Sequence, residues 1–189
     1  MSSSITRNST IKRGKTQIPI IEDLDEVLKK SEHNIFLFGR VGSGKTYLAN
    51  NLCDCSFKTQ KRGFSCTHTV QHGYSRHFNM IIIDFPGLKS AKNIMLHLRM
   101  QKEALSTIPV RLICFIVKND RLDQILSEIN ELKKIFFNYL ENVAIIITNS
   151  EDCDQKEIKE ITHVVSKKSK INKVFLTSGK TNFYNYVKI

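Results

Sequence analysis

The chain has 189 residues, of which 41% are hydrophobic, and a formal net charge of +11 at pH 7. This length and composition predict one compact domain with a sizeable core and leave no segment for a second one. The longest apolar runs have the length of a strand, far short of the roughly 20 residues of a membrane-spanning helix, which argues against a transmembrane segment.

The expected compartment follows from the first residues and the cysteines. The N-terminus, Met1-Ser2-Ser3-Ser4, has no apolar signal core and no second-position glycine for myristoylation. The five cysteines fit free thiols in a reducing compartment, so we expect a cytoplasmic protein. Basic clusters near both ends leave room for peripheral contact with an anionic membrane. Nucleic acid is the less favoured partner, because such clusters are more often solvated.

The first predicted elements surround a glycine-rich turn. Residues 1–19 are polar and basic, which predicts a flexible basic arm, and the folded domain is expected to span residues 20–189. An apolar run at residues 34–38 predicts a strand, and a helix is expected at residues 46–52. The turn between them reads Gly39-Arg40-Val41-Gly42-Ser43-Gly44-Lys45-Thr46, and Tyr47 follows it.

This turn has the form G-x-x-x-x-G-K-S/T in the strand-turn-helix context that the motif requires. The glycines keep the main chain bare enough to wrap phosphates, and the following helix directs unpaired amides at them. Lys45 is expected to reach the β and γ oxygens, and the Thr46 hydroxyl to hold Mg²⁺. The turn therefore predicts binding of a nucleoside triphosphate.

Two strands are predicted next, at residues 67–74 and 77–84. Alternating polarity in the first and a continuous apolar run in the second predict an edge strand beside a buried one. The second strand leads into Asp84-Phe85-Pro86-Gly87. After a phosphate-binding turn, we expect Asp84 to reach Mg²⁺ through water and the Gly87 amide to face the γ-phosphate.

Strand and helix signals alternate through the rest of the chain. Helices are expected at residues 94–106 and 155–165, and strands at residues 110–117, 143–148 and 173–177. A further helix carries an apolar stripe assigned to the core: Leu122, Ile125, Leu126, Ile129, Leu132, Ile135 and Phe136. This order predicts an α/β fold, with a mostly parallel sheet covered on both faces and ligands at the carboxyl ends of the strands.

A polar loop after the strand at residues 143–148 reads Asn149-Ser150-Glu151-Asp152 and has the form N-x-x-D. A carboxylate there can accept from the two N–H donors on the Watson–Crick edge of guanine, which adenine does not offer. Asp152 is therefore the candidate base reader, and Asn149 belongs to the same loop.

The motifs in this order resemble those of translation-factor-related P-loop GTPases, and within them the immunity-associated group, the vertebrate GIMAP proteins and their plant avirulence-induced relatives. Besides the glycine-rich turn, Phe64-Ser65-Cys66-Thr67-His68-Thr69 is similar to that group's S-V-T-K-T box, and D-F-P-G is similar to its D-T-P-G. The resemblance implies a three-layer P-loop NTPase G domain, with a six-stranded sheet that has one antiparallel edge strand. It implies GTP or GDP and Mg²⁺ as cofactors.

The last motif is Ser178-Gly179-Lys180, which stands where G proteins carry an S-A-K-like loop. The resemblance implies that this loop meets the guanine oxygen through a backbone amide. Because only residues 181–189 follow, the closing helix is expected to be short or missing.

The resemblance also bears on hydrolysis. It implies that Thr67, or in second place Thr69, is the switch threonine, a catalytic residue with Lys45 and a metal ligand with Thr46 and Asp84. Leu88 stands where Ras-like proteins have the glutamine that positions water, so intrinsic hydrolysis should be slow. Relatives commonly pair through their nucleotide faces, so a partner or a second copy is expected to stimulate it. The candidate donors of an arginine are Arg40, Arg76, Arg99 and Arg121, among which spacing does not choose.

We therefore expect a GTP-binding protein with slow, partner- or dimer-stimulated hydrolysis that acts as a nucleotide-dependent switch. The first alternative is a nucleotide-gated assembly scaffold with little turnover. The second is an ATP-dependent P-loop enzyme, which would need a second substrate site that no segment suggests.

Overall fold

A computed structural model of the chain describes residues 33–53, 57, 70–76, 79–87, 101–106 and 108–177. The strands are β1 (His33–Phe38), β2 (Gln71–Ser75), β3 (Met80–Asp84), β4 (Leu112–Lys118), β5 (Val143–Thr148) and β6 (Val174–Leu176). The helices are α2 (Lys45–Leu52), α4 (Leu122–Ile135) and α5 (Gln155–Ser169), with a 3₁₀ helix at Phe137–Asn142. Residues 101–106 are helical as well.

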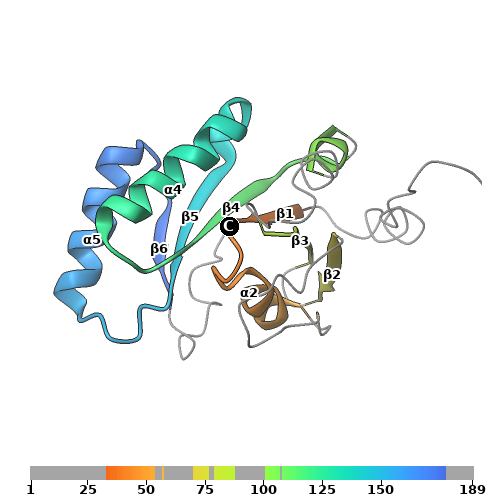
Figure 1. Cartoon of the computed structure of the whole chain (residues 1–189). Helices are drawn as coiled ribbons and strands as arrows, with labels where there is room; N and C mark the ends of the chain where they lie inside the picture. Colours follow the sequence, from red (N-terminus) through yellow and green to blue (C-terminus); the bar gives the residue numbers. More distant parts are fainter. Residues whose placement is uncertain are drawn as a thin grey trace, which may run out of the picture.

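The six strands form one sheet in the order β2-β3-β1-β4-β5-β6 (Figure 1). All neighbours pair in parallel except β2, which is antiparallel to β3 and lies at the edge. Every residue of β3 is buried, whereas β2 alternates between half-buried and buried positions at its end. The predicted six-stranded, mostly parallel sheet with one antiparallel edge strand is therefore confirmed.

Helices cover both faces of the sheet, with α4 and α5 on one side and α2 on the other (Figure 1). Alternate residues of β1 contact the two layers. Phe36 and Phe38 join the core beneath α4 and α5, and Ile35 and Leu37 join the core beneath α2. Because both faces of β1 are buried, its carboxyl end is held firmly, and the glycine-rich turn starts there.

An aromatic cluster supports the same end of β1. The ring of Phe38 lies 4.5 Å from that of Phe85, which follows β3, and 4.3 Å from that of Phe136, which ends α4. All three side chains are buried. The cluster fixes the loop after β3 and the last turn of α4 relative to β1, and so fixes the surroundings of the turn.

Some expected boundaries differ from those of the structure. β3 begins at Met80 rather than at residue 77, after Asn79 takes a left-handed conformation. α5 runs on to Ser169, where Lys170 in a left-handed conformation ends it. The core assignment of Ile135 is wrong: the residue is 43% exposed, because Phe136 already turns into the core at the end of the helix.

Several expectations lie outside the described residues. They are the arm at residues 1–19, most of the helix expected at residues 94–106, residues 67–69 of the expected edge strand, and residues 181–189 after the last motif. Among the helices that are described, none has both the length and the apolar character needed to span a membrane.

Candidate functional site

The glycine-rich turn lies between β1 and α2, at the carboxyl ends of the parallel strands. Two of its glycines are required by geometry. A Cβ on Gly39 would overlap the carbonyl oxygen of Ile116 and lie 2.8 Å from Ser43 Oγ. Gly44 precedes α2 with a φ of 90°, a backbone conformation that residues other than glycine rarely adopt. The turn can therefore follow this path only with glycine at these positions.

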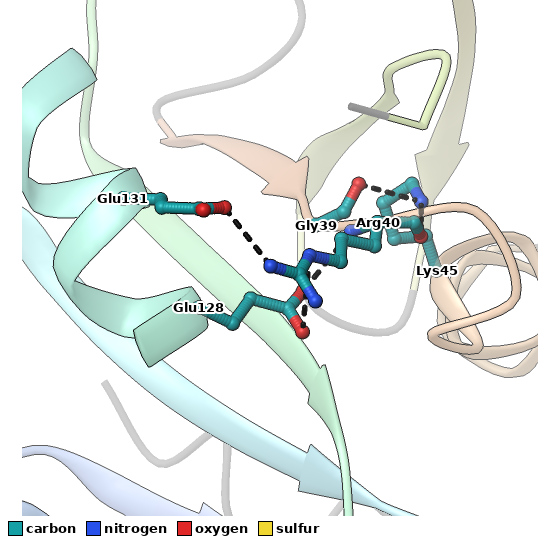
Figure 2. A network of polar contacts seen from close by, with 5 residues as sticks. All are labelled: Gly39, Arg40, Lys45, Glu128 and Glu131. Carbon is teal, nitrogen blue, oxygen red and sulfur yellow. Dashed lines mark hydrogen bonds and ion pairs between the residues drawn. The ribbon is translucent and has the colours of Figure 1, made fainter. Parts of the chain in front are cut away.

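Lys45 lies inside the turn rather than on its surface. Its Nζ donates to the carbonyl oxygens of Gly39, at 3.1 Å, and of Arg40, at 2.7 Å. Lys45 is buried, so the turn curls around an ammonium group (Figure 2). This places a positive charge beside main-chain groups at the end of β1.

Thr46 and Asp84, both expected to serve Mg²⁺, are side by side. The Thr46 hydroxyl donates to Asp84 Oδ2 at 2.7 Å, and Asp84 is fully buried at the end of β3. Hydroxyl and carboxylate oxygens are hard ligands of the kind Mg²⁺ prefers, so the chemistry of this pair fits that ion.

The end of β5 holds the turn from another side. Thr148 Oγ1 donates to the carbonyl oxygen of Ser43 at 2.8 Å, and Gly44 lies against the Thr148 side chain. Sequence reasoning assigned Thr148 to a strand and gave it no role. A threonine as the last residue of an otherwise apolar strand was the available signal.

A third attachment runs from the turn to α4. The main-chain N–H of Arg40 donates to Glu128 Oε1 at 3.2 Å, and the guanidinium donates to Glu131 Oε2 at 3.0 Å (Figure 2). Arg40 Nε lies 3.8 Å from the Glu128 carboxylate. Arg40, one of the candidate arginine donors, is thus engaged within its own chain. Sequence reasoning missed Glu128, although this charge falls on the apolar stripe of its helix.

The electrostatics of Glu128 follow from this position. Burial raises the pKa of its carboxyl above the usual value of 4.5, while the N–H bond and charge of Arg40 and the charge of Lys45 pull it back. A buried carboxylate needs such partners, because an uncompensated one is strongly unfavourable. Arg40 and Lys45 of the turn therefore offset part of the effect of burial on the pKa of Glu128, and burial remains the larger effect.

The loop after β3 packs directly on the turn. Gly87 is buried, and a Cβ there would lie 2.6 Å from Val41 Cγ2 and 2.7 Å from Val41 N. The structure thus brings the D-F-P-G motif against the glycine-rich turn. The absence of a side chain at Gly87 permits this contact.

The loop expected to read the base follows β5. Asn149 is exposed, with a left-handed φ of 59°, and Asp152 is exposed. Ser150 is buried and its hydroxyl donates to the carbonyl oxygen of Ile147 at 3.3 Å. Asn119 Nδ2 donates to Cys153 Sγ at 3.3 Å, which ties this loop to the end of β4. The Asp152 carboxylate is thus presented to solvent at the edge of the sheet that bears the turn.

The remaining expected site residues divide into two groups. Tyr47 is described; it lies on α2, and the residue is 52% exposed. The others lie outside the described residues: Thr67, Thr69, Leu88, Ser178, Gly179 and Lys180.

Comparison with known proteins identifies the family and the fold. The sequence profile of the 50S ribosome-binding GTPases matches residues 34–150. No curated protein matches the chain at a significant level. Similar solved structures include Toc33 from Arabidopsis thaliana in complex with GDP and Mg²⁺, at TM-score 0.55 and 16% identity over 83% of this chain and 76% of that one.

Two more neighbours have the same fold. NFeoB from S. thermophilus bound to GDP.AlF4⁻ and K⁺ gives TM-score 0.61 and 19% identity over 82% of this chain. A probable GTP-binding protein, engB, gives 0.56 and 18%, over 82% of this chain and 94% of that one. This chain covers 60% of the NFeoB chain, less than two thirds of its length.

Proposed function

Because the chain belongs to the 50S ribosome-binding GTPase family, we propose that it binds GTP and GDP with Mg²⁺ and hydrolyses GTP slowly, as a nucleotide-dependent switch. The observation that carries this proposal is the turn at residues 39–46, which Thr148 holds at Ser43 and Lys45 holds from inside. A turn fixed in this way keeps its main-chain amides directed at one small volume, which is what a phosphate chain requires.

Each part of the site has a proposed role. The amides of the turn and of the first turn of α2 bind phosphate oxygens, aided by the positive end of the helix dipole. Lys45 exchanges part of its bonding to the turn for the β and γ oxygens. Thr46 and Asp84 would hold Mg²⁺, which would supply positive charge against the charge that develops on the phosphate oxygens. Thr67, or in second place Thr69, joins them when the γ-phosphate is present.

Guanine selectivity is assigned to the loops after β5 and β6. Asp152 accepts from the N–H groups of guanine, Asn149 supports that loop, and the Ser178-Gly179-Lys180 loop meets the guanine oxygen. The exposure of Asp152 supports this role, because its carboxylate is accessible to a ligand. Adenine has no matching pair of donors and would leave the carboxylate unpaired.

Slow hydrolysis follows from Leu88, whose side chain has no group to orient water. We propose that a partner or a second copy completes the site. One Toc33 structure is that of a dimerisation-deficient mutant, which means that Toc33 without this mutation forms dimers. This motivates the proposal that a second copy completes the site of this chain. The Arg40 guanidinium would have to leave Glu131 to act across such an interface. Arg40 is also half-buried, whereas Arg76 and Arg121 are exposed, so it is the least accessible of the described candidate donors.

The finer relationships remain proposals as well. We place the chain near the immunity-associated GTPases because of its D-F-P-G motif and its Phe64–Thr69 segment. We propose a cytoplasmic protein whose basic clusters permit peripheral membrane contact, with nucleic acid as the less favoured partner.

Calorimetric titration with Mg-GDP, Mg-GTP and Mg-ATP tests the proposal. We expect guanine nucleotides to bind and ATP to be rejected by up to about 10⁴-fold. Asp152→Asn should abolish this preference or redirect it to xanthosine nucleotides, whereas Glu151→Gln, the matched change one residue earlier, should retain it. Equal binding of ATP would refute the base assignment, and no binding of any guanine nucleotide by folded protein would refute the function.

A second candidate function is a nucleotide-gated assembly scaffold with little turnover, which Leu88 favours. Its test is the molecular mass in solution with GDP and with a non-hydrolysable GTP analogue. A change of mass between the two states supports the scaffold, and a monomer in both leaves no assembly to gate.

A further inference from the structure

The peptide unit between Gly39 and Arg40 is held from both of its polar ends. Its N–H donates to Glu128 Oε1 at 3.2 Å, and its carbonyl oxygen accepts from Lys45 Nζ at 3.1 Å. In a trans peptide the N–H and C=O point in opposite directions. A carboxylate on one side and an ammonium on the other therefore fix the rotation of this unit (Figure 2).

Glu128 is itself well anchored. It lies on α4 beside Ile125 and Ile129, which are buried in the core. The end of the same helix is held by Phe136 against Phe38 of β1. The Glu128 side chain is only 10% exposed, so it has little freedom to follow the turn if the turn moves. The carboxylate therefore acts as a fixed reference point.

We propose that Glu128 is a positioning residue of the phosphate-binding turn: by accepting the Arg40 N–H, it turns the Gly39 carbonyl oxygen toward Lys45 Nζ and so places the ammonium. The inference deepens the proposed function. Its nucleotide-affinity measurement rests on that function, whereas its hydrogen-exchange measurement does not. If the peptide unit rotated, it would lose its bond to Glu128 and its bond to Lys45 together. Of the two hydrogen bonds from Lys45 Nζ to the start of the turn, only the one to the Arg40 carbonyl oxygen would remain.

Glu131 provides a matched control for this role. It lies on the same helix and pairs with the same residue, but through the guanidinium Nη2 at 3.0 Å rather than through the main chain. Both side chains of that pair are more than a third exposed, so the pair adds little. Removing Glu131 changes the charge near Arg40 and leaves the Gly39–Arg40 peptide unit bonded on both sides.

Amide hydrogen exchange of the nucleotide-free protein tests positioning without any ligand. We expect Glu128→Ala to speed exchange in the peptide spanning residues 39–46 by about tenfold, since one hydrogen bond to a charged group is lost. Glu128→Gln retains an oxygen acceptor and should stay within about threefold of the original protein, and Glu131→Ala should match it. Exchange in β5 and α5 serves as the control for intact folding. The inference is overturned if residues 39–46 exchange at the same rate in Glu128→Ala as in the wild-type protein. It is also overturned if Glu128→Gln or Glu131→Ala speeds exchange there as much as Glu128→Ala does.

Affinity for Mg-GDP is the second readout. We expect Glu128→Ala to bind about tenfold more weakly, with Glu128→Gln and Glu131→Ala near the original. If the original protein binds no guanine nucleotide but the exchange results hold, the proposed function fails and the positioning role stands. If the original protein binds Mg-GDP and Glu128→Ala binds it equally well, the positioning role fails and the function stands.

Discussion

Thr46 Oγ1 donates a hydrogen bond to Asp84 Oδ2 across 2.7 Å, although the two residues are 38 positions apart in the sequence. They meet because β1 and β3 are parallel neighbours, paired with Leu37 opposite Asp84, so the segments that follow both strands emerge at one edge of the sheet. Asp84 is fully buried there. Two oxygen-bearing side chains from different chain segments, both proposed to hold Mg²⁺, are thus brought side by side.

We expect Asp84→Asn to weaken the Mg²⁺ dependence of GDP binding. The amide keeps the size of the side chain and one oxygen, but it removes the negative charge that attracts the ion. Mg²⁺ affinity should fall by about 10- to 100-fold, while binding in the presence of EDTA should change little. The measurement is GDP affinity over a Mg²⁺ titration.

Asp123→Asn is the control for this change. Asp123 lies on α4 in a surface ion pair with Arg121, and its side chain is 68% exposed. The Mg²⁺ titration of that variant should match the original. An Asp84→Asn protein with an unchanged Mg²⁺ dependence would contradict the assignment of Asp84 to the metal.

We expect Gly87→Ala to lower the free energy of unfolding by about 1–3 kcal/mol, the usual effect of overpacking. The new Cβ would lie 2.6 Å from Val41 Cγ2 and 2.8 Å from Val41 Cα, so the loop after β3 and the turn must separate. Urea unfolding of the single and double variants with Val41→Ala measures the coupling. Because Val41→Ala removes Cγ2 and leaves the main chain, it should recover part of the loss. Equal losses with and without Val41→Ala would show that the crowding lies elsewhere.

The sequence predicted the alternation of strands and helices, the mostly parallel sheet with one antiparallel edge strand, and the position of the glycine-rich turn after β1. β5 begins and ends at the expected residues 143 and 148, because a continuous apolar run bounded by polar residues defines a buried strand. The turn, Thr46 and Asp84 were predicted as site residues because each belongs to a motif that follows a strand. The parallel pairing of β1 and β3 is enough to explain why Thr46 and Asp84 lie together.

The contacts that hold the turn in place could not be predicted in the same way. Arg40 and Glu128 are 88 positions apart, and Ser43 and Thr148 are 105 apart. Such pairs depend on how a helix is rotated and seated on the sheet, which periodicity does not specify. The exposure of Ile135 has the same origin. An apolar stripe predicts which face of a helix is buried, but not how far along the helix the sheet covers that face.

We expect Asp154→Ala to destabilise α5 by about 1 kcal/mol. Asp154 caps this helix, because its carboxylate accepts from the N–H groups of Lys156 and Glu157, at 2.7 and 2.8 Å. The Glu157 carboxylate in turn accepts from the Asp154 N–H at 2.9 Å. Thermal or urea unfolding measures the loss. Glu160→Ala, at an exposed position inside the same helix, should stay within about 0.5 kcal/mol of the original. Equal effects of the two changes would mean that the cap adds nothing beyond surface charge.

Glu128 should also leave a signature in the pH dependence of stability. Burial raises the pKa of its carboxyl above 4.5, so the folded protein keeps this proton to higher pH than the unfolded chain does. The contribution of Glu128 to the free energy of unfolding is therefore fully present below about pH 4.5 and is lost as the pH rises through the raised pKa. Glu128→Gln does not titrate and should gain stability relative to the original protein across that interval.

The measurement is the free energy of unfolding from urea curves between pH 4 and pH 8, taken as the difference between Glu128→Gln and the original. Glu141→Gln, at an exposed position on the 3₁₀ helix, reports the effect of losing one surface charge. A difference that grows in favour of Glu128→Gln as the pH rises means that the ionised carboxylate is held beside the turn against the preference of the fold, as expected of a group retained for positioning. A difference of the opposite sign would mean that Arg40 and Lys45 outweigh burial, and that Glu128 is a net stabilising residue of the core.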